Sequence, residues 1–416
     1  MTYHFYYLSN FFTNHMKKII LSLMTLVSLT ASAQFGGFGG FGGGGGNPWV
    51  DSEAATSEDF KPALSNQDSK QYPMVNSARQ VRAQISAPEA TKVGLDIAGK
   101  IYTMTKDENG VWTGTSAPQD PGFHYYQLNI DGASVPDPGS LYYYGASRWG
   151  SGIEVPSEDQ DFWQVKNVPQ GSMGEVYYYS TYTEKMRRCF VYLPNEYFTN
   201  PTKKFPVLYL QHGMGENEYS WPYQGHVASI MDNLIAAKKA LPFIVVMDNG
   251  LNAAKPRPAG EAPQGGQRRQ GGFGGFGGGF AEDFKNVLFN DIMPMVEKNY
   301  RVIADPEHRA YAGLSMGGMQ AREVTLANPG KFAYVGSFSS GAWSVDQVKN
   351  SEGFAQKTKL LFMSGGGKEN MGCVEAAKKI KEQLGMNAVG YESEGTAHEF
   401  HTWRRSLYEF AQLLFK

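Results

Sequence analysis

A serine set between glycines offers the first chemistry in this sequence. Gly313-Leu314-Ser315-Met316-Gly317 fits the pattern G-x-S-x-G, preceded by the apolar run RAYAG and followed by GMQAREVTLA. The run predicts a strand and the following segment a helix, so the serine falls on a sharp strand-to-helix turn. The N-terminus of a helix favours negative charge developing beside the serine oxygen. We therefore predict a nucleophilic serine; the alternative is a structural glycine turn.

A nucleophilic serine needs a base and an acid that orients the base. In α/β-hydrolases both follow the serine along the chain, the acid first and the histidine second. Two histidines lie downstream, His398 and His401, and we favour His398 because it follows a strand-like segment and a Gly-Thr-Ala turn. Glu369 is the only carboxylate in the loop after the strand KLLFMSGGG and is the predicted acid. The alternative for Glu369 is an exposed loop charge.

An oxyanion hole needs two backbone amides near the serine. One amide is expected from Met316, the residue after the nucleophile. The other is expected from the loop 212–215, which reads HGMG after the strand FPVLYLQ, with Met214 as the donor. Residues 216–218 are expected to brace this loop by hydrogen bonding.

Three tryptophans are candidates for lining an aromatic acyl pocket: Trp221, Trp343 and Trp403. Burial in the core is the alternative for each of them, because tryptophan is mostly buried. A serine, histidine and acid need no metal and no organic cofactor, so we expect none. Two cysteines cannot make a disulfide framework or a cysteine zinc site, and we expect both to be buried free thiols.

The elements that must position these residues alternate along the chain. FPVLYLQHG, FIVVMDNG, RAYAG and KLLFMSGGG read as strands. VASIMDNLIAAKKA reads as an amphipathic helix, and FKNVLFNDIMPMVEKNY and VEAAKKIKEQLG read as helices. This alternation predicts an α/β domain with a parallel sheet over residues 158–416. A glycine-rich stretch, 259–280, interrupts that domain and is expected to be a solvated insertion.

Residues 75–157 show a different pattern. Short runs with alternating apolar positions, such as VRAQISAP, KVGLDIAG and FHYYQLNIDG, are separated by turn signals at near-regular intervals. The spacing predicts a small all-β sandwich of immunoglobulin-like size. Trp112 is expected in its core, and Tyr142–Tyr144 and Trp149 are the candidates for contact with a sugar.

The N-terminal segment has the order of a secretory signal peptide. Residues 1–33 contain a start at Met16, two lysines, an apolar run too short to span a bilayer, and a small-residue cleavage site. No cysteine follows the cleavage site, so we expect a secreted or periplasmic protein without a lipid anchor or membrane span. Residues 34–74 begin with dense glycine and are predicted to be a flexible linker.

Composition excludes other classes of protein. The net charge is −2 and charged residues make up 19% of the chain, so no positive field suited to nucleic acid is expected. The hydrophobic fraction of 41% is high enough for buried cores and argues against wholesale disorder. Much of the excess of glycine, 49 residues, lies in the two low-complexity stretches.

Several motifs in order resemble a known family. LQHGMGENEYSW, IMPMVEKNYRV, AGLSMGGMQA and AHEFHTWRRSLYEF resemble the esterase D-like carbohydrate esterase family 1, over about residues 175–416. The resemblance implies an α/β-hydrolase that cleaves ester substituents from plant polysaccharides, with Ser315 and His398 as nucleophile and base. The family pattern has an aspartate where this chain has Asn370, so either Glu369 supplies the carboxylate or the triad is weakened.

The sandwich resembles the family 48 carbohydrate-binding modules and related early-set domains, through KVGLDIAG, GVWTG and PGFHYYQLNIDG. Together the two resemblances imply a secreted serine esterase that removes feruloyl groups from plant cell-wall polysaccharide such as arabinoxylan. The expected partner is that polysaccharide or a feruloylated oligosaccharide. An acetyl-xylan esterase, an acyltransferase and a glycan-binding protein with a degenerate esterase domain remain alternatives.

Overall fold

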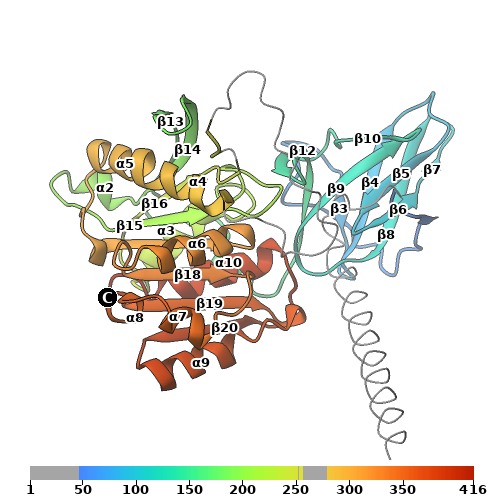
Figure 1. Cartoon of the computed structure of the whole chain (residues 1–416). Helices are drawn as coiled ribbons and strands as arrows, with labels where there is room; N and C mark the ends of the chain where they lie inside the picture. The colour runs from blue at the N-terminus through green and yellow to red at the C-terminus, as the bar shows by residue number, and fades with distance from the viewer. Residues whose placement is uncertain (1–45, 252, 256–278) are drawn as a thin grey trace, which may run out of the picture.

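The computed structural model describes residues 46–251, 253–255 and 279–416 (Figure 1). The predicted signal peptide, 1–33 with its start at Met16, lies outside these residues, as does the predicted insertion 259–280 except for its last two positions. In the described part of the chain, no helix is long and apolar enough to cross a membrane.

The N-terminal part forms two facing sheets, which confirms the predicted all-β sandwich (Figure 1). The first sheet has the order β1-β6-β5-β9-β12-β11, with β10 beside β9; these strands are β1 (Trp49–Asp51), β5 (Val93–Ile97), β6 (Lys100–Thr103), β9 (Gly122–Ile130), β10 (Ala133–Val135), β11 (Tyr142–Gly145) and β12 (Arg148–Val155). The second has the order β2-β3-β4-β8-β7, namely β2 (Lys61–Pro62), β3 (Met74–Val75), β4 (Gln80–Ser86), β7 (Thr105–Lys106) and β8 (Val111–Pro118). Trp112 is 7% exposed and lies in the core between them, as expected.

The predicted linker 34–74 differs from the structure in its described part. From Trp49 onward the chain pairs with both sheets, since β1 runs parallel to β6 and β2 pairs with β3. The buried amide of Gln80 accepts hydrogen bonds from the backbone and the hydroxyl of Thr56, at 2.8 and 2.9 Å. These segments are held by contacts with distant residues rather than by their own periodicity, so a reading of local pattern assigns them to a linker.

The C-terminal part is built on one eight-stranded sheet, which confirms the predicted α/β-hydrolase fold. Its order is β13-β14-β16-β15-β17-β18-β19-β20, namely β13 (Ser172–Ser180), β14 (Lys185–Leu193), β15 (Val207–Gln211), β16 (Ile244–Asp248), β17 (Arg309–Leu314), β18 (Tyr334–Phe338), β19 (Leu360–Gly366) and β20 (Ala388–Ser393). The strands from β16 to β20 run parallel, whereas β13 and β14 pair antiparallel with their neighbours. The central strands are buried on both faces, as parallel strands usually are.

Helices cover both faces of this sheet. One apolar cluster packs on α3 (Val227–Ala236) and α10 (Phe400–Ala411). The other packs on helices of the opposite face: α4 (Gly279–Val287), η3 (Leu288–Ile292), α5 (Met293–Asn299), α6 (Met316–Ala327), α7 (Val345–Lys349), α8 (Phe354–Lys357) and α9 (Cys373–Leu384). Successive residues of β15 alternate between the clusters, because neighbouring side chains of a strand point to opposite faces. The remaining described elements are short helices of three or four residues: η1 (Gln160–Phe162), α2 (Glu196–Thr199), η4 (Pro306–His308) and η5 (Gly367–Glu369).

A buried ion pair joins the two parts of the molecule. Arg404 of α10 is fully buried, and its Nη2 lies 2.5 Å from Oε1 of Glu154 in β12, whose side chain is 6% exposed. Burial raises the pKa of Glu154, but the charges and hydrogen bonds of Arg404 and His226 together outweigh it and hold the pKa at about 2. The carboxylate therefore stays charged at the interface at neutral pH.

Candidate active site

Ser315 makes the turn between strand and helix by itself. β17 ends at Leu314 and α6 begins at Met316, while Ser315 has φ 48° and ψ −114°, in the left-handed half of the map that only strongly held non-glycine residues occupy. The flanking glycines permit this close approach, since a Cβ on Gly317 would stand 2.6 Å from the backbone oxygen of His212. The predicted strand–turn–helix is present, and it presents the serine at the N-terminus of α6.

His398 lies between the serine and an acid. Its Nε2 is 3.0 Å from Oγ of Ser315, and its Nδ1 is 2.7 Å from Oε1 of Glu369. An ionised carboxylate only accepts hydrogen bonds, so Nδ1 carries the proton and donates it. The lone pair of Nε2 is therefore directed at the serine hydroxyl, which is the arrangement that proton transfer from serine requires.

The acid loop places Glu369 rather than Asn370 against the histidine. Oε2 of Glu369 accepts hydrogen bonds from the backbone N–H of Gly366 and the hydroxyl of Ser339, each at 2.7 Å. Burial raises the pKa of this carboxyl, but the hydrogen bond and charge of His398, with these two donors, bring it below its usual value. Asn370 is exposed and has φ 53°, closing the η5 turn. The turn thus moves the carboxylate one position along the chain from the family pattern.

The loop from His212 to Glu216, here called the oxyanion loop, is held by its own histidine. Nδ1 of His212 donates to the carbonyl of Gly213 at 2.7 Å, and its Nε2 accepts from the N–H of Gly250 at 3.0 Å. Burial lowers the pKa of His212 to about 4, so the ring is neutral at pH 7. In a trans peptide the N–H and C=O point in opposite directions. Since the carbonyl of Gly213 faces the ring, the N–H of Met214 points away from it.

A buried acid closes the same loop. Glu216 is 1% exposed, and its Oε2 accepts from the N–H of Gly213 at 3.1 Å. Its Oε1 finds no hydrogen-bond partner among the residues that the structure describes. Burial raises the pKa of Glu216 to about 8, so this carboxyl is protonated at neutral pH. A Cβ on Gly213 would lie 3.4 Å from Cβ of Ser315, so the loop runs directly beside the serine.

The Esterase family profile matches residues 180–413, and this span contains the serine, the acid and the histidine in the order described above. The chain belongs to the Esterase family.

Proteins similar to this esterase include enzymes named as feruloyl or ferulic acid esterases. It is 44% identical over 368 residues to an endo-1,4-beta-xylanase/feruloyl esterase of Xylanibacter ruminicola; the match covers 86% of this chain but only 48% of the relative, so the chain spans about half of that protein's length. A ferulic acid esterase of carbohydrate esterase family 1 from Anaeromyces mucronatus shares the fold, with a TM-score of 0.50, 21% identity, and coverage of 62% of this chain and 96% of that one. The resemblance of the C-terminal part to this family, predicted from the motifs, is thereby confirmed.

The fold likeness also extends to the sandwich. The enterobactin esterase of Shigella flexneri has a TM-score of 0.57 and 15% identity, and the match covers 81% of this chain and 92% of that one. Coverage of that size includes strands of both parts of the esterase. The specific resemblance of the sandwich to family 48 carbohydrate-binding modules remains a prediction.

The three tryptophans predicted as pocket lining are core residues. Trp221, Trp343 and Trp403 are each about 1% exposed and lie within the apolar clusters of the sheet faces. The prediction that they line an open acyl pocket is therefore wrong, and the alternative of core burial holds. Trp403 has an indirect role in the site, because its ring meets that of His398 edge to face at 5.1 Å.

Exposed aromatic side chains instead gather beside the oxyanion loop of this esterase. Trp149, 47% exposed, lies 5.0 Å from the ring of Tyr219, and Tyr144 lies 5.6 Å from Trp149. Tyr223, 48% exposed, follows at 5.7 Å from Tyr219. The sequence pattern indicated Tyr144 and Trp149 as contact residues but missed the two tyrosines, whose signal is their position just after the HGMG loop. Of the other two sandwich candidates, Tyr142 is 46% exposed, whereas Tyr143 is buried against Phe123.

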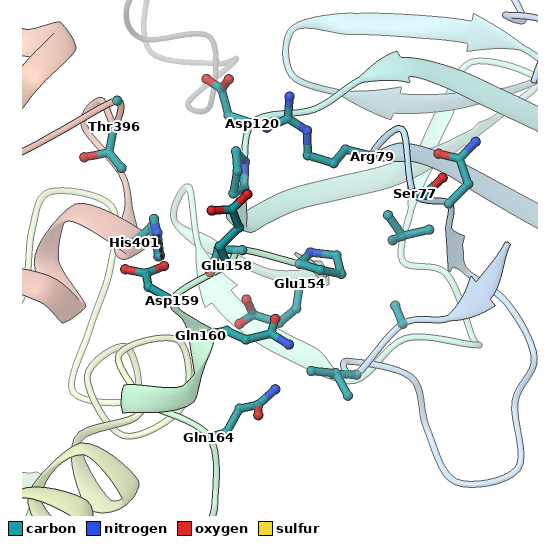
Figure 2. Close-up of a pocket in the computed structure, with 18 of the residues that line it drawn as sticks. Ser77, Arg79, Asp120, Glu154, Glu158, Asp159, Gln160, Gln164, Thr396 and His401 are labelled. Carbon is teal, nitrogen blue, oxygen red and sulfur yellow. Dashed lines mark ion pairs between the residues drawn. The ribbon is translucent and has the colours of Figure 1, made fainter. Parts of the chain in front are cut away.

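A hollow lies between the sandwich and the α/β domain. It has a volume of about 1130 Å³, and polar side chains of both parts line it, among them Arg79, Asp120, Asp159 and His401 (Figure 2). Ser315, His398 and Glu369 do not belong to its lining. His401 is buried in α10, where its Nε2 lies 3.3 Å from Oδ1 of Asp159, and burial lowers its pKa to about 4.

Neither cysteine is positioned for chemistry at the site. Cys189 and Cys373 are buried and unpaired, as expected. In the three described ranges, no group of three or more histidine, cysteine or acidic side chains has the arrangement of a metal site. The expectation that catalysis uses no cofactor stays a prediction.

Proposed function

We propose that this protein is a serine esterase that removes feruloyl groups from plant cell-wall polysaccharide such as arabinoxylan, through an acyl-serine intermediate. The observation that carries the proposal is the chain of two hydrogen bonds from Glu369 through His398 to Ser315. It supports the roles of acid, base and nucleophile that the sequence predicts for these residues. The same relay on other folds performs acyl transfer.

The geometry supports the following sequence of steps. Oγ of Ser315 attacks the ester carbonyl carbon while Nε2 of His398 takes the hydroxyl proton. The carbonyl oxygen becomes an oxyanion, and the N–H groups of Met316 and Met214 are its proposed donors. The imidazolium then protonates the departing sugar oxygen as the ester bond breaks. Water attacks the acyl-serine with His398 again as base, which releases the carboxylic acid and restores the serine.

The nature of the acyl group and of the alcohol rests on the relatives and on the exposed aromatic rings. The 44% identical relative is named a xylanase and feruloyl esterase, and the proposal assigns the feruloyl esterase part of that name to this chain. Trp149 is 47% exposed next to Tyr219, beside the oxyanion loop, and an exposed aromatic ring suits both an aromatic acyl group and the apolar face of a sugar. The predicted signal peptide supports action outside the cytoplasm.

The test compares methyl ferulate, feruloylated arabinoxylan and acetylated xylan as substrates for the full chain. Release of ferulic acid from the first two, well above release of acetate from the third, is the expected result. Ser315→Ala should lose activity by several orders of magnitude while it remains folded. An acid release by the wild type that Ser315→Ala matches would refute the serine mechanism. Dominant release of acetate would instead support an acetyl-xylan esterase.

A further inference from the structure

We propose that the hairpin formed by β11 and β12 of the sandwich is a positioning element of the ester-cleaving site, because it holds the outer end of the oxyanion loop. This inference rests on the proposed function. It assigns to the sandwich a part in the chemical step itself, separate from any contact that it makes with sugar.

The decisive contact is a hydrogen bond between the two parts of the chain. The backbone N–H of Ser147, at the tip of the hairpin, donates to the carbonyl of Gly215 at 2.7 Å. Ala146 and Ser147 have φ values of 50° and 63°, so the two-residue turn is of the kind in which both central residues are left-handed. This conformation fixes the direction of the Ser147 amide, which therefore meets the loop as a rigid donor.

The bond completes the support of the proposed oxyanion donor. On one side of Met214, the carbonyl of Gly213 is held by the ring of His212. On the other side, the carbonyl of Gly215 is held by Ser147. The peptide group that carries the Met214 N–H is thus restrained by the α/β domain, and the peptide group that follows Gly215, one residue beyond Met214, is restrained by the sandwich. Donors to an oxyanion act through their fixed position. Loss of either restraint therefore reduces the stabilisation of the transition state rather than the binding of the ester.

The hairpin is itself anchored where it meets the α/β domain. The buried side-chain amide of Gln224 donates to the hydroxyl of Tyr125 at 2.7 Å and to the carbonyl of Tyr144 at 2.8 Å. The backbone carbonyl of Gln224 accepts a hydrogen bond from Nε of Arg404 at 2.7 Å, and Arg404 in turn pairs with Glu154. The end of β11 is therefore fixed through buried polar contacts, and the turn beyond it has little freedom to leave the loop.

The sandwich reaches the other loops of the site as well. Asp120 pairs with Lys368, the residue before the proposed acid, at 2.7 Å. A Cβ on Gly122 would stand 2.7 Å from Cβ of His401, at the start of the helix that follows the proposed base. These contacts make the sandwich a common support for three segments of the site. Deleting the sandwich would leave the buried Arg404 without its acid, so a point change at the turn is the cleaner experiment.

Ser147→Pro in the full chain removes the donor N–H and demands a φ near −65°, which the turn does not have. Ala146→Asn is the matched control, since asparagine suits a left-handed position and leaves the Ser147 amide in place. Insertion of two glycines between these residues is a second variant that displaces the amide without proline. Each is compared with wild type for kcat and KM on methyl ferulate, which carries no sugar, and for phosphorylation of Ser315 by diethyl 4-nitrophenyl phosphate, whose P=O oxygen uses the same donors. Circular dichroism and Tm establish folding.

We expect Ser147→Pro and the insertion to lower kcat and the phosphorylation rate by about tenfold or more, with KM changed by less than about threefold. Ala146→Asn should match wild type. Wild-type kcat and phosphorylation rate in a folded Ser147→Pro protein overturn the proposal, and the folded insertion variant decides it where the proline variant does not fold. If Ser315 of the wild type reacts with the phosphate ester but methyl ferulate is not cleaved, the feruloyl assignment fails while the phosphorylation rates still test the hairpin.

Discussion

Glu369 and Asn370 are neighbours in the acid loop, but only Glu369 can carry a negative charge beside the histidine. A carboxylate stabilises the imidazolium that forms when the serine loses its proton, whereas an amide only orients the ring. The 2.7 Å contact between Glu369 and Nδ1 of His398 places the carboxylate in that position. The sequence motif alone left this choice open, because a shift of one residue in a short turn is decided by backbone conformation.

We predict that Glu369→Gln lowers kcat for methyl ferulate by two to four orders of magnitude, on the order of the loss seen when a triad acid becomes an amide. Asn370→Ala, one position away and exposed, should keep kcat within about a factor of three, since surface changes of this kind have small effects. Steady-state kinetics at pH 7 measures both. A large loss of kcat in Asn370→Ala, together with an active Glu369→Gln, would assign the orienting role to Asn370. The proposed triad would then lack its carboxylate.

Glu216 predicts a pH dependence of stability. Burial raises its pKa from about 4.5 to about 8 in the folded protein. Between these two values the unfolded chain loses the proton while the folded chain keeps it, so the folded state binds more protons and stability falls as pH rises from 4.5 to 8. The contribution amounts to a few kcal/mol, on the order of 1.4 kcal/mol for each pH unit.

Glu216→Gln removes this titration, so the difference in unfolding free energy between variant and wild type should shift in favour of the variant from pH 5 to pH 8. Urea unfolding at four pH values measures it. Glu108→Gln, at an exposed carboxyl of the sandwich, is the control and should follow the wild-type profile. Parallel profiles for wild type and Glu216→Gln would show that the buried carboxyl is ionised in the folded protein.

At the scale of elements, the strand–turn–helix around Ser315 was predictable because its parts are local. An apolar strand, two close glycines and a helix are adjacent in the sequence, and the fold needs only their order. The strands β1 to β3 were not predictable in this way. β1 gains its hydrogen bonds from β6, about fifty residues later, and the Trp49 side chain packs over Gly94. Such pairings leave no periodic signal in the segment itself.

The close packing of the nucleophile turn gives a prediction for its glycines. Gly317→Ala should bring its Cβ against the backbone oxygens of His212 and Gln211, at 2.6 and 2.7 Å, and neither can move as a flexible side chain would. We expect destabilisation of about 1–3 kcal/mol, as for other overpacked sites, and a loss of kcat of more than about tenfold from displacement of the oxyanion loop.

Gly174→Ala is the matched control, because that glycine of β13 has no atom within 4 Å of an added Cβ. Urea unfolding and kinetics on methyl ferulate compare the two variants. Wild-type stability and kcat in Gly317→Ala would mean that the turn relaxes without disturbing the loop.

At the scale of the whole molecule, two contacts between the sandwich and the α/β domain, the buried pair of Glu154 with Arg404 and the exposed pair of Asp120 with Lys368, should differ in energetic weight. Glu154→Ala leaves the guanidinium of Arg404 buried without its acid, which typically costs about 3–5 kcal/mol. Asp120→Asn breaks the pair with Lys368, in which both side chains are about half exposed, and should cost no more than about 1 kcal/mol.

Differential scanning calorimetry of the two variants and of wild type measures these losses. Wild type should unfold in a single transition, because the parts share buried polar contacts. Glu154→Ala should lower Tm markedly or separate the transition into two, whereas Asp120→Asn should follow wild type. Equal small shifts in both variants would show that the interface does not couple the two parts. The sequence does not indicate this interface, because Glu154 and Arg404 lie 250 residues apart.

The pairing of Glu154 with Arg404 also has a consequence for the order of events during synthesis. A ribosome completes the sandwich first, and at about 5–20 residues per second the chain reaches Arg404 roughly ten to fifty seconds later. During that interval the carboxylate of Glu154 remains hydrated. His398 and α10 emerge together, so the nucleophile acquires its base at the same stage at which the two parts close on each other. A nascent or truncated esterase is therefore expected to show no activity toward esters until α10 has been made.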